Sequence, residues 1–276
     1  MISSWLSRLT SPRPVEIPAP AWGAALAGQA CFKHLDEAQL TRLRQMAGEL
    51  LASKQMEAAG GLALTAEIQA GIAAQACLPV LELGLAWYRG WTSIIVYPSE
   101  FLVPRQHADE AGVVHEYIEP LSGEAWDGGP VILSWADAQQ SAGELGQSYS
   151  VVIHEFTHKL DQMNGEADGS PPFDRRLHAG LSPRRWRQTL EDAYERFCAE
   201  LDLIEAEIPR DLDPDSPAAD PYYARLPLDA YAATDPAEFF AVSSETFFTD
   251  PQRLQAAFPD WYGLLAAFFR QDPAAP

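Results

Sequence analysis

Residues 151–161 read Val-Val-Ile-His-Glu-Phe-Thr-His-Lys-Leu-Asp, and this stretch decides how the rest of the chain is interpreted. Apolar side chains recur in and just beyond it at spacings of three and four, which predicts a helix from about Ser148 to Asn164 with one buried face: Ile153, Phe156, Leu160 and Met163. His154 and His158 fall on a different face, one turn apart, so both imidazole rings point the same way.

This histidine pair predicts a metal site. Two imidazoles one helical turn apart can both reach a single Zn²⁺ ion. Glu155, beside the first histidine, can take a proton from a water molecule that the metal activates. We therefore expect His154 and His158 to bind one zinc ion and Glu155 to act as the general base of a hydrolase. The alternative is a helix whose two histidines bind no metal.

A catalytic zinc ion needs a third protein ligand. One known pattern places a glycine and then a third histidine after the pair, but Asp161 and Asn164 occupy those positions here. A helix predicted for residues 235–248 instead offers Glu238 and Glu245 on one face. A buried carboxylate on this aromatic-rich helix needs a partner, and a metal ion would supply it.

Several roles stay open on the sequence alone. Glu238 could instead complete a capping box that Asp235 begins. A ligand histidine is usually oriented by a carboxylate, and both Asp161 and Glu245 are candidates for that role. A structural zinc site would use four ligands, often cysteines, and none of the three cysteines in this chain is suitably placed.

The rest of the chain predicts an α+β fold with a small sheet and a mainly helical remainder. The predicted helices cover about 36–59, 65–77, 183–205, 235–248 and 260–270, and the predicted strands 91–97, 113–118 and 131–135. Residues 1–20 contain several prolines and are expected to form an extended arm, followed by one domain over 21–276. The strand at 131–135 is either a core strand or an edge that binds an extended peptide.

Charge and hydropathy exclude two classes of partner. The formal net charge of −20 repels phosphate backbones, so direct nucleic-acid binding is not expected. No apolar run approaches the roughly 20 residues that span a bilayer, and no signal peptide is recognisable. We expect a cytoplasmic protein with no membrane contact. The acidic segment 207–227 has five prolines and is expected to be a long loop, functional or mobile.

Two blocks of the sequence resemble a known family. Residues 152–165, with the histidine pair and a closing Asn-Gly, and residues 238–248, Glu-Phe-Phe-Ala-Val-Ser-Ser-Glu-Thr-Phe-Phe, resemble the Mlc titration factor A family of bacterial zinc peptidases. The same blocks are similar to the catalytic domain of anthrax lethal factor. That resemblance implies a zincin-like peptidase fold with Glu238 as the third zinc ligand. It also implies that Tyr231, seven residues earlier, donates a hydrogen bond to the oxyanion of the reaction.

The sequence departs from lethal factor at one position. Lethal factor has an acidic residue one helical turn after its ligand glutamate, whereas this chain has Val242 at that position. The role of that acid in orienting a histidine then passes to Glu245 or Asp161.

The family resemblance also implies a function. It implies a cytoplasmic, aminopeptidase-like hydrolase that acts on peptides and binds the Mlc-type repressor of sugar-uptake genes, which would link it to regulation of the glucose phosphotransferase system. The alternative is a regulator that binds a protein partner on a zincin scaffold without catalysis. The intact Glu155 argues against a purely binding role, because a scaffold needs no base at that position.

Overall fold

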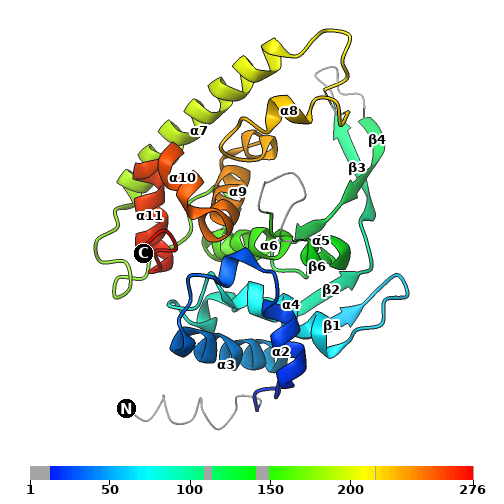
Figure 1. Cartoon of the computed structure of the whole chain (residues 1–276), viewed down its shortest axis with the longest axis vertical. Helices are drawn as coiled ribbons and strands as arrows, with labels where there is room; N and C mark the ends of the chain where they lie inside the picture. Colours follow the sequence, from blue (N-terminus) through cyan, green and yellow to red (C-terminus); the bar gives the residue numbers. More distant parts are fainter. Residues whose placement is uncertain (1–12, 109–113, 141–148, 215, 276) are drawn as a thin grey trace.

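A computed structural model of the chain describes residues 13–108, 114–140, 149–214 and 216–275. Helices dominate these ranges, and a four-stranded sheet and a separate hairpin complete them, so the mixed α+β class is confirmed (Figure 1). None of the described helices is both long and apolar enough to cross a lipid bilayer.

The main sheet has the strand order β1–β2–β6–β5. Strands β1 (Gln55–Ala58), β2 (Ser93–Tyr97) and β6 (Val131–Ser134) are parallel, while the short β5 (Gly123–Ala125) runs antiparallel to β6 at one edge. Every residue of β6 is buried, as expected for a strand with neighbours on both sides and helices on its faces. Strands β3 (Phe101–Ala108) and β4 (Val114–Leu121) form the separate antiparallel hairpin.

The helices form two groups with one helix between them. The N-terminal group comprises α2 (Ala19–Leu26), η1 (Ala30–Phe32), α3 (Glu37–Ser53), α4 (Ala66–Cys77) and η2 (Leu85–Tyr88). The C-terminal group comprises α7 (Pro183–Glu207), α8 (Asp220–Tyr223), η4 (Ala230–Ala233), α9 (Pro236–Thr249), α10 (Pro251–Ala257) and α11 (Pro259–Phe269). Helix α6 (Val151–Asp161) lies between the two groups, next to the short α5 (Trp135–Gln139) (Figure 1).

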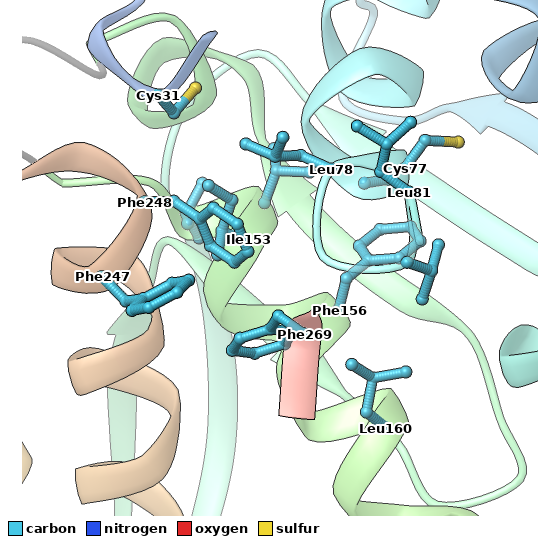
Figure 2. Packing of buried hydrophobic residues seen from close by; sticks show 14 of the residues in the cluster. Cys31, Cys77, Leu78, Leu81, Ile153, Phe156, Leu160, Phe247, Phe248 and Phe269 are labelled. Carbon is cyan, nitrogen blue, oxygen red and sulfur yellow. The ribbon is translucent and has the colours of Figure 1, made fainter. Parts of the chain in front are cut away.

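Helix α6 is central because its apolar face is fully buried. Ile153, Phe156 and Leu160 point into a cluster that also receives Leu78 from the end of α4 and Phe248 from α9 (Figure 2). The Phe156 ring packs edge-on against two aromatic rings. Its centroid lies 5.1 Å from that of Tyr88, at the end of η2, and 5.6 Å from that of Trp91. Both groups of helices therefore use α6 as a shared part of the core.

The sequence marks the helix starts with polar caps, and the structure uses them. In each case a side-chain oxygen accepts a hydrogen bond from a backbone N–H in the first turn, which satisfies a donor that the helix itself leaves free. The capping residues are Asp36 for α3, Thr65 for α4, Ser150 for α6, Ser182 for α7 and Asp235 for α9.

Two helix predictions extend too far. The helix predicted for 36–59 ends at Ser53, because the next residues form β1, whose backbone pairs with β2. The apolar face predicted for α6 includes Met163, but α6 ends at Asp161 and a 3₁₀ turn, η3 (Gln162–Asn164), follows. The changed helical geometry leaves Met163 41% exposed.

Several strands and helices differ from the prediction. Strands β1, β3 and β5 and helices α2, α5, α8 and α10 were not predicted. The strand predicted for 131–135 ends at Ser134, which caps α5. Since β2 and β5 flank this strand on both sides, it is not an edge that could bind a peptide, and β5 holds the edge position instead. The segment 207–227 is not entirely irregular, because it contains α8 and the buried Leu226.

The N-terminal segment is described from residue 13 onwards. Residues 1–12, where most of the expected extended arm lies, and position 113 of a predicted strand fall outside the described residues. Val15 N–H donates to Gly48 O on α3 at 2.9 Å, and the Ile17 side chain is buried. The stretch before α2 thus packs on the body of the protein, and the division at residue 20 stays a prediction.

The packing of α6 generates a stability test. Phe156→Ala should lower the free energy of unfolding by about 3–5 kcal/mol, because the fully buried ring leaves a cavity between η2 and α6. Urea denaturation would measure this loss. Met163→Ala is the matched control, and its effect should stay within about 0.5 kcal/mol because the side chain is exposed. Equal losses in both variants would contradict the described apolar face.

Candidate metal centre

Helices α6 and α9 bring three possible metal ligands together. His154 Nε2 and His158 Nε2 lie 3.1 Å apart, one helical turn from each other on α6. Glu238 Oε2 on α9 lies 3.1 Å from His154 Nε2 and 3.3 Å from His158 Nε2. One ligand atom from each residue can be chosen so that all lie within 4.8 Å of one another. The structure thus joins the three residues that the sequence and the family resemblance single out.

The cap of α9 explains why Glu238 is available. Asp235 Oδ1 accepts hydrogen bonds from the backbone N–H groups of Ala237 at 2.8 Å and Glu238 at 3.0 Å. The aspartate therefore caps the helix by itself, while the Glu238 carboxylate faces the two imidazoles. The capping-box alternative for Glu238 does not describe this helix start, because its side chain does not return to the cap.

The chemistry of these three groups fits a zinc ion. Glu238 Oε2 is buried and makes no well-directed hydrogen bond to any described group, although both histidines are near. Two imidazole nitrogens facing each other at 3.1 Å cannot both keep a lone pair without a shared acceptor of those electrons. A cation that accepts lone pairs from two nitrogens and one oxygen would satisfy all three atoms. Such a donor set is typical of catalytic Zn²⁺ sites.

Glu245 orients the first histidine. Its Oε1 lies 2.6 Å from His154 Nδ1, and its Oε2 accepts the Ser150 N–H at 2.9 Å. This contact fits a neutral His154 that carries its proton on Nδ1, donates it to the Glu245 carboxylate and leaves the Nε2 lone pair toward Glu238 and His158. Ser150, which caps α6, also donates through its Oγ to Gln75 Oε1 at 2.8 Å. Helices α4, α6 and α9 are thereby joined behind the metal centre.

Asp161, the other candidate for that role, has a different partner. Its Oδ2 accepts the Gly169 N–H at 2.7 Å, so it holds the loop after α6 rather than a histidine. Burial raises its pKa to about 6, although the hydrogen bond from Gly169 opposes the shift. Of the two open candidates, Glu245 is therefore the one that contacts a possible metal ligand.

Glu155 is buried beside the histidines and touches the edge of the sheet. Burial raises the pKa of its carboxyl to about 7, against the opposing effect of His154 and His158. A Cβ atom added at Gly123 would overlap Glu155 Oε1 and would lie 2.6 Å from Val151 Cγ2. Only a glycine lets β5 pass this close to the Glu155 carboxylate.

Tyr231 lies beside His154. It belongs to η4, is 51% exposed, and its ring centroid is 6.1 Å from that of His154. Asp229 fixes the turn by accepting the Tyr231 N–H at 2.9 Å. A cavity of about 290 Å³ adjoins His154, Glu155 and Tyr231. The tyrosine therefore borders the space that a substrate at this centre would enter.

Comparison with known proteins agrees with this centre. A family model described as glucose-regulated metallo-peptidase M90 matches residues 4–270. The chain belongs to the M90 metallopeptidase family. One similar protein is the Mlc titration factor A of Klebsiella pneumoniae (strain ATCC 700721 / MGH 78578). It is 39% identical to this chain, and the match covers 92% of this chain and 87% of the relative's own length.

Two further relatives carry the same name. The Mlc titration factor A of Serratia proteamaculans (strain 568) is 40% identical over 87% of this chain and 83% of its own length. That of Yersinia pestis (strain Pestoides F) is 37% identical over 87% of this chain and 81% of its own length. The M90 match spans both sequence blocks that carry the resemblance, so the expected family is confirmed.

Other residues around the candidate metal centre give little signal in the sequence. Lys159 is 3% exposed, and its Nζ donates to the backbone carbonyls of Trp126 and Gly129 in the turn between β5 and β6. Gln162 Nε2 donates to Ala125 O at 2.9 Å. Burial lowers the pKa of the Lys159 amine to about 8. A lysine or glutamine on a helix is usually exposed, so only the structure reveals that they fix the edge strand to α6.

The geometry predicts different effects for the two glutamates of α9. Glu238→Ala should nearly abolish zinc binding, because it removes one of three ligand atoms. Glu245→Ala should weaken it by about 10- to 100-fold, the usual effect of losing a carboxylate that orients a ligand histidine. Competition with a chromogenic chelator would measure both affinities. Glu191→Ala on the exposed face of α7 is the control and should bind zinc like the parent. Equal affinities for the two α9 variants would show that the ligand assignment is wrong.

Proposed function

We propose that this chain is a zinc-dependent peptidase in which His154, His158 and Glu238 hold the ion. The observation that carries the proposal is the convergence of two imidazole nitrogens and one buried carboxylate oxygen beside a second buried carboxylate, Glu155. Membership of a metallopeptidase family supports the same reaction class. The pairing of His154 with Glu245 supports the assignment, because catalytic zinc ligands are commonly oriented in this way.

The residues divide the chemistry among them. A bound Zn²⁺ would supply a Lewis acid that activates water and polarises the peptide carbonyl. Glu155 accepts the proton of the attacking water and then passes it to the leaving amine, and a carboxyl pKa near 7 suits both transfers at neutral pH. Tyr231 donates its hydroxyl proton in a hydrogen bond to the oxyanion, from its position beside His154.

The edge strand β5 is the best place for the substrate backbone. Within the described residues β6 is its one strand partner, so its other side is the edge along which an extended peptide would pair. A peptide paired there would run past Gly123 and so past the Glu155 carboxylate. Lys159 and Gln162 act as positioning residues because they hold this strand and its turn against α6.

The proposal predicts the behaviour of one conservative variant. Glu155→Gln should keep the zinc affinity of the parent, because Glu155 is not a ligand, and should lose hydrolysis by about 10²- to 10⁴-fold, the usual contribution of a general base. Metal analysis and cleavage of a peptide panel, with and without chelator, would measure both properties. Turnover at the parent rate would remove Glu155 from the mechanism.

The same assay separates the finer alternatives. A parent protein that binds zinc in this centre but cleaves no peptide would favour a non-catalytic regulator on the same scaffold. The aminopeptidase-like preference is part of the proposal, and it requires that acetylation of the peptide N-terminus stops cleavage. Equal cleavage of free and acetylated peptides would instead indicate an endopeptidase.

We also propose that the chain binds an Mlc-type repressor, because its relatives carry the name Mlc titration factor A. Glu155→Gln should bind a purified Mlc-type repressor as tightly as the parent, since one buried side chain changes without altering the surface. Size-exclusion chromatography of the mixed proteins would detect the complex. A repressor that elutes unchanged in the presence of the parent protein would refute this partner.

A further inference from the structure

The cavity beside the metal centre is built as a pocket. It has a volume of about 290 Å³ and extends from His154 and Glu155 to Asp250 and Arg253 at the start of α10. Sites that enclose a whole small molecule usually measure about 300–1,000 Å³, so this space is at the lower limit. It is suited to one side chain of a peptide whose backbone remains outside, along β5.

One face of α9 continues from the metal centre into this pocket. Glu238, Val242 and Thr246 follow one another at intervals of four residues and therefore lie on the same side of the helix. Val242 and Thr246 both line the cavity. A side chain next to the bond that is cleaved at the metal would thus lie directly against these two residues.

Three aliphatic side chains form an apolar part of the pocket wall. Val242 faces the cavity from α9, Leu121 from the end of β4, and Leu228 from the segment before η4. The Leu228 side chain is only 2% exposed, which leaves a firm wall rather than a mobile one. A large apolar side chain that packs against these residues is removed from water, which favours its binding.

The charges around the cavity are unfavourable to an acidic side chain. Four carboxylates line it: Glu155, Asp229, Glu245 and Asp250. Arg253 is the one cationic side chain among the lining residues, and its guanidinium donates to the carbonyls of Ala224 and Leu226. Those carbonyls are neutral, so the guanidinium keeps its charge, but one positive charge is outnumbered by the four carboxyl groups that an incoming anion would meet.

We propose that this cavity is the specificity pocket of the enzyme and that it selects a large uncharged side chain, aromatic or long aliphatic, next to the scissile bond. Val242, Thr246 and Leu121 determine the selection, and acidic side chains are rejected. The inference rests on the proposed peptidase function and adds the substrate class to it.

Alanine-based hexapeptides with Phe, Leu, Ala or Glu at one position would test the pocket, with mass spectrometry locating the cleaved bond. We expect kcat/KM for Phe and Leu next to that bond to exceed the value for Ala by at least about 10-fold, as apolar pockets typically achieve, and the Glu peptide to fall below Ala. Equal rates for Phe and Ala would overturn the proposal while leaving the peptidase function intact.

Two variants connect the preference to the pocket. Thr246→Phe fills the cavity and should reduce the ratio of the Phe rate to the Ala rate by about 10-fold, whereas Leu121→Ala, at a half-buried strand end, removes a wall and should reduce it less. Leu203→Phe on α7, 69% exposed, is the control and should keep the parent ratio. If both pocket variants bound zinc normally and kept the parent's ratio of the Phe rate to the Ala rate, the cavity would not be the specificity pocket.

A binding measurement separates this inference from the peptidase function. In Glu155→Gln, the dissociation constants of the Phe and Ala peptides should differ by about 10-fold, and adding Thr246→Phe should remove the difference. If the parent cleaves nothing but this difference is present, the pocket stands and the peptidase function fails. If cleavage occurs and both dissociation constants are equal, the pocket assignment fails.

Discussion

The contact between α6 and α9 is the interaction on which the site depends. Glu238 and Glu245 stand seven residues apart on one face of α9 and reach the two nitrogens of a single imidazole, that of His154. Each helix alone carries only part of a metal site. Their packing is secured by the apolar cluster around Ile153 and Phe248, so the hydrophobic core sets the distances between the polar groups (Figure 2).

This arrangement concentrates negative charge in a small buried volume. Glu155, Glu238 and Glu245 all lie within reach of the two histidines, and burial alone would favour their neutral forms. The nearby imidazoles nevertheless hold the pKa of Glu238 well below its usual value, so this carboxyl stays ionised. The pKa of Glu155, in contrast, is raised to about 7. These different environments suit the two carboxyl groups to the different tasks that we propose for them, one as an ion ligand and one as a proton carrier.

Much of this could be predicted from the sequence, and the failures have physical causes. The histidine pair and the caps Thr65, Ser182 and Asp235 are local signals, so the helices that bear them were found. Glu238 and Glu245 could not be ranked by periodicity because both lie on one helical face, and only the family resemblance favoured Glu238. Strand β5 has only three residues, Gly-Glu-Ala, which carry no alternating apolar pattern, and it exists through its antiparallel pairing with β6 across a short turn.

The bare backbone at Gly123 has a consequence for how the protein can vary. The edge strand packs against the Glu155 side chain at Gly123, and Lys159 donates a hydrogen bond to the turn that follows β5. The edge of the sheet is therefore held in a fixed position relative to α6, which carries both histidines. An insertion or deletion in the β5–β6 turn would therefore displace Glu155 as well as the strand. Length changes in related proteins are expected to accumulate elsewhere, in connections that do not bear on α6.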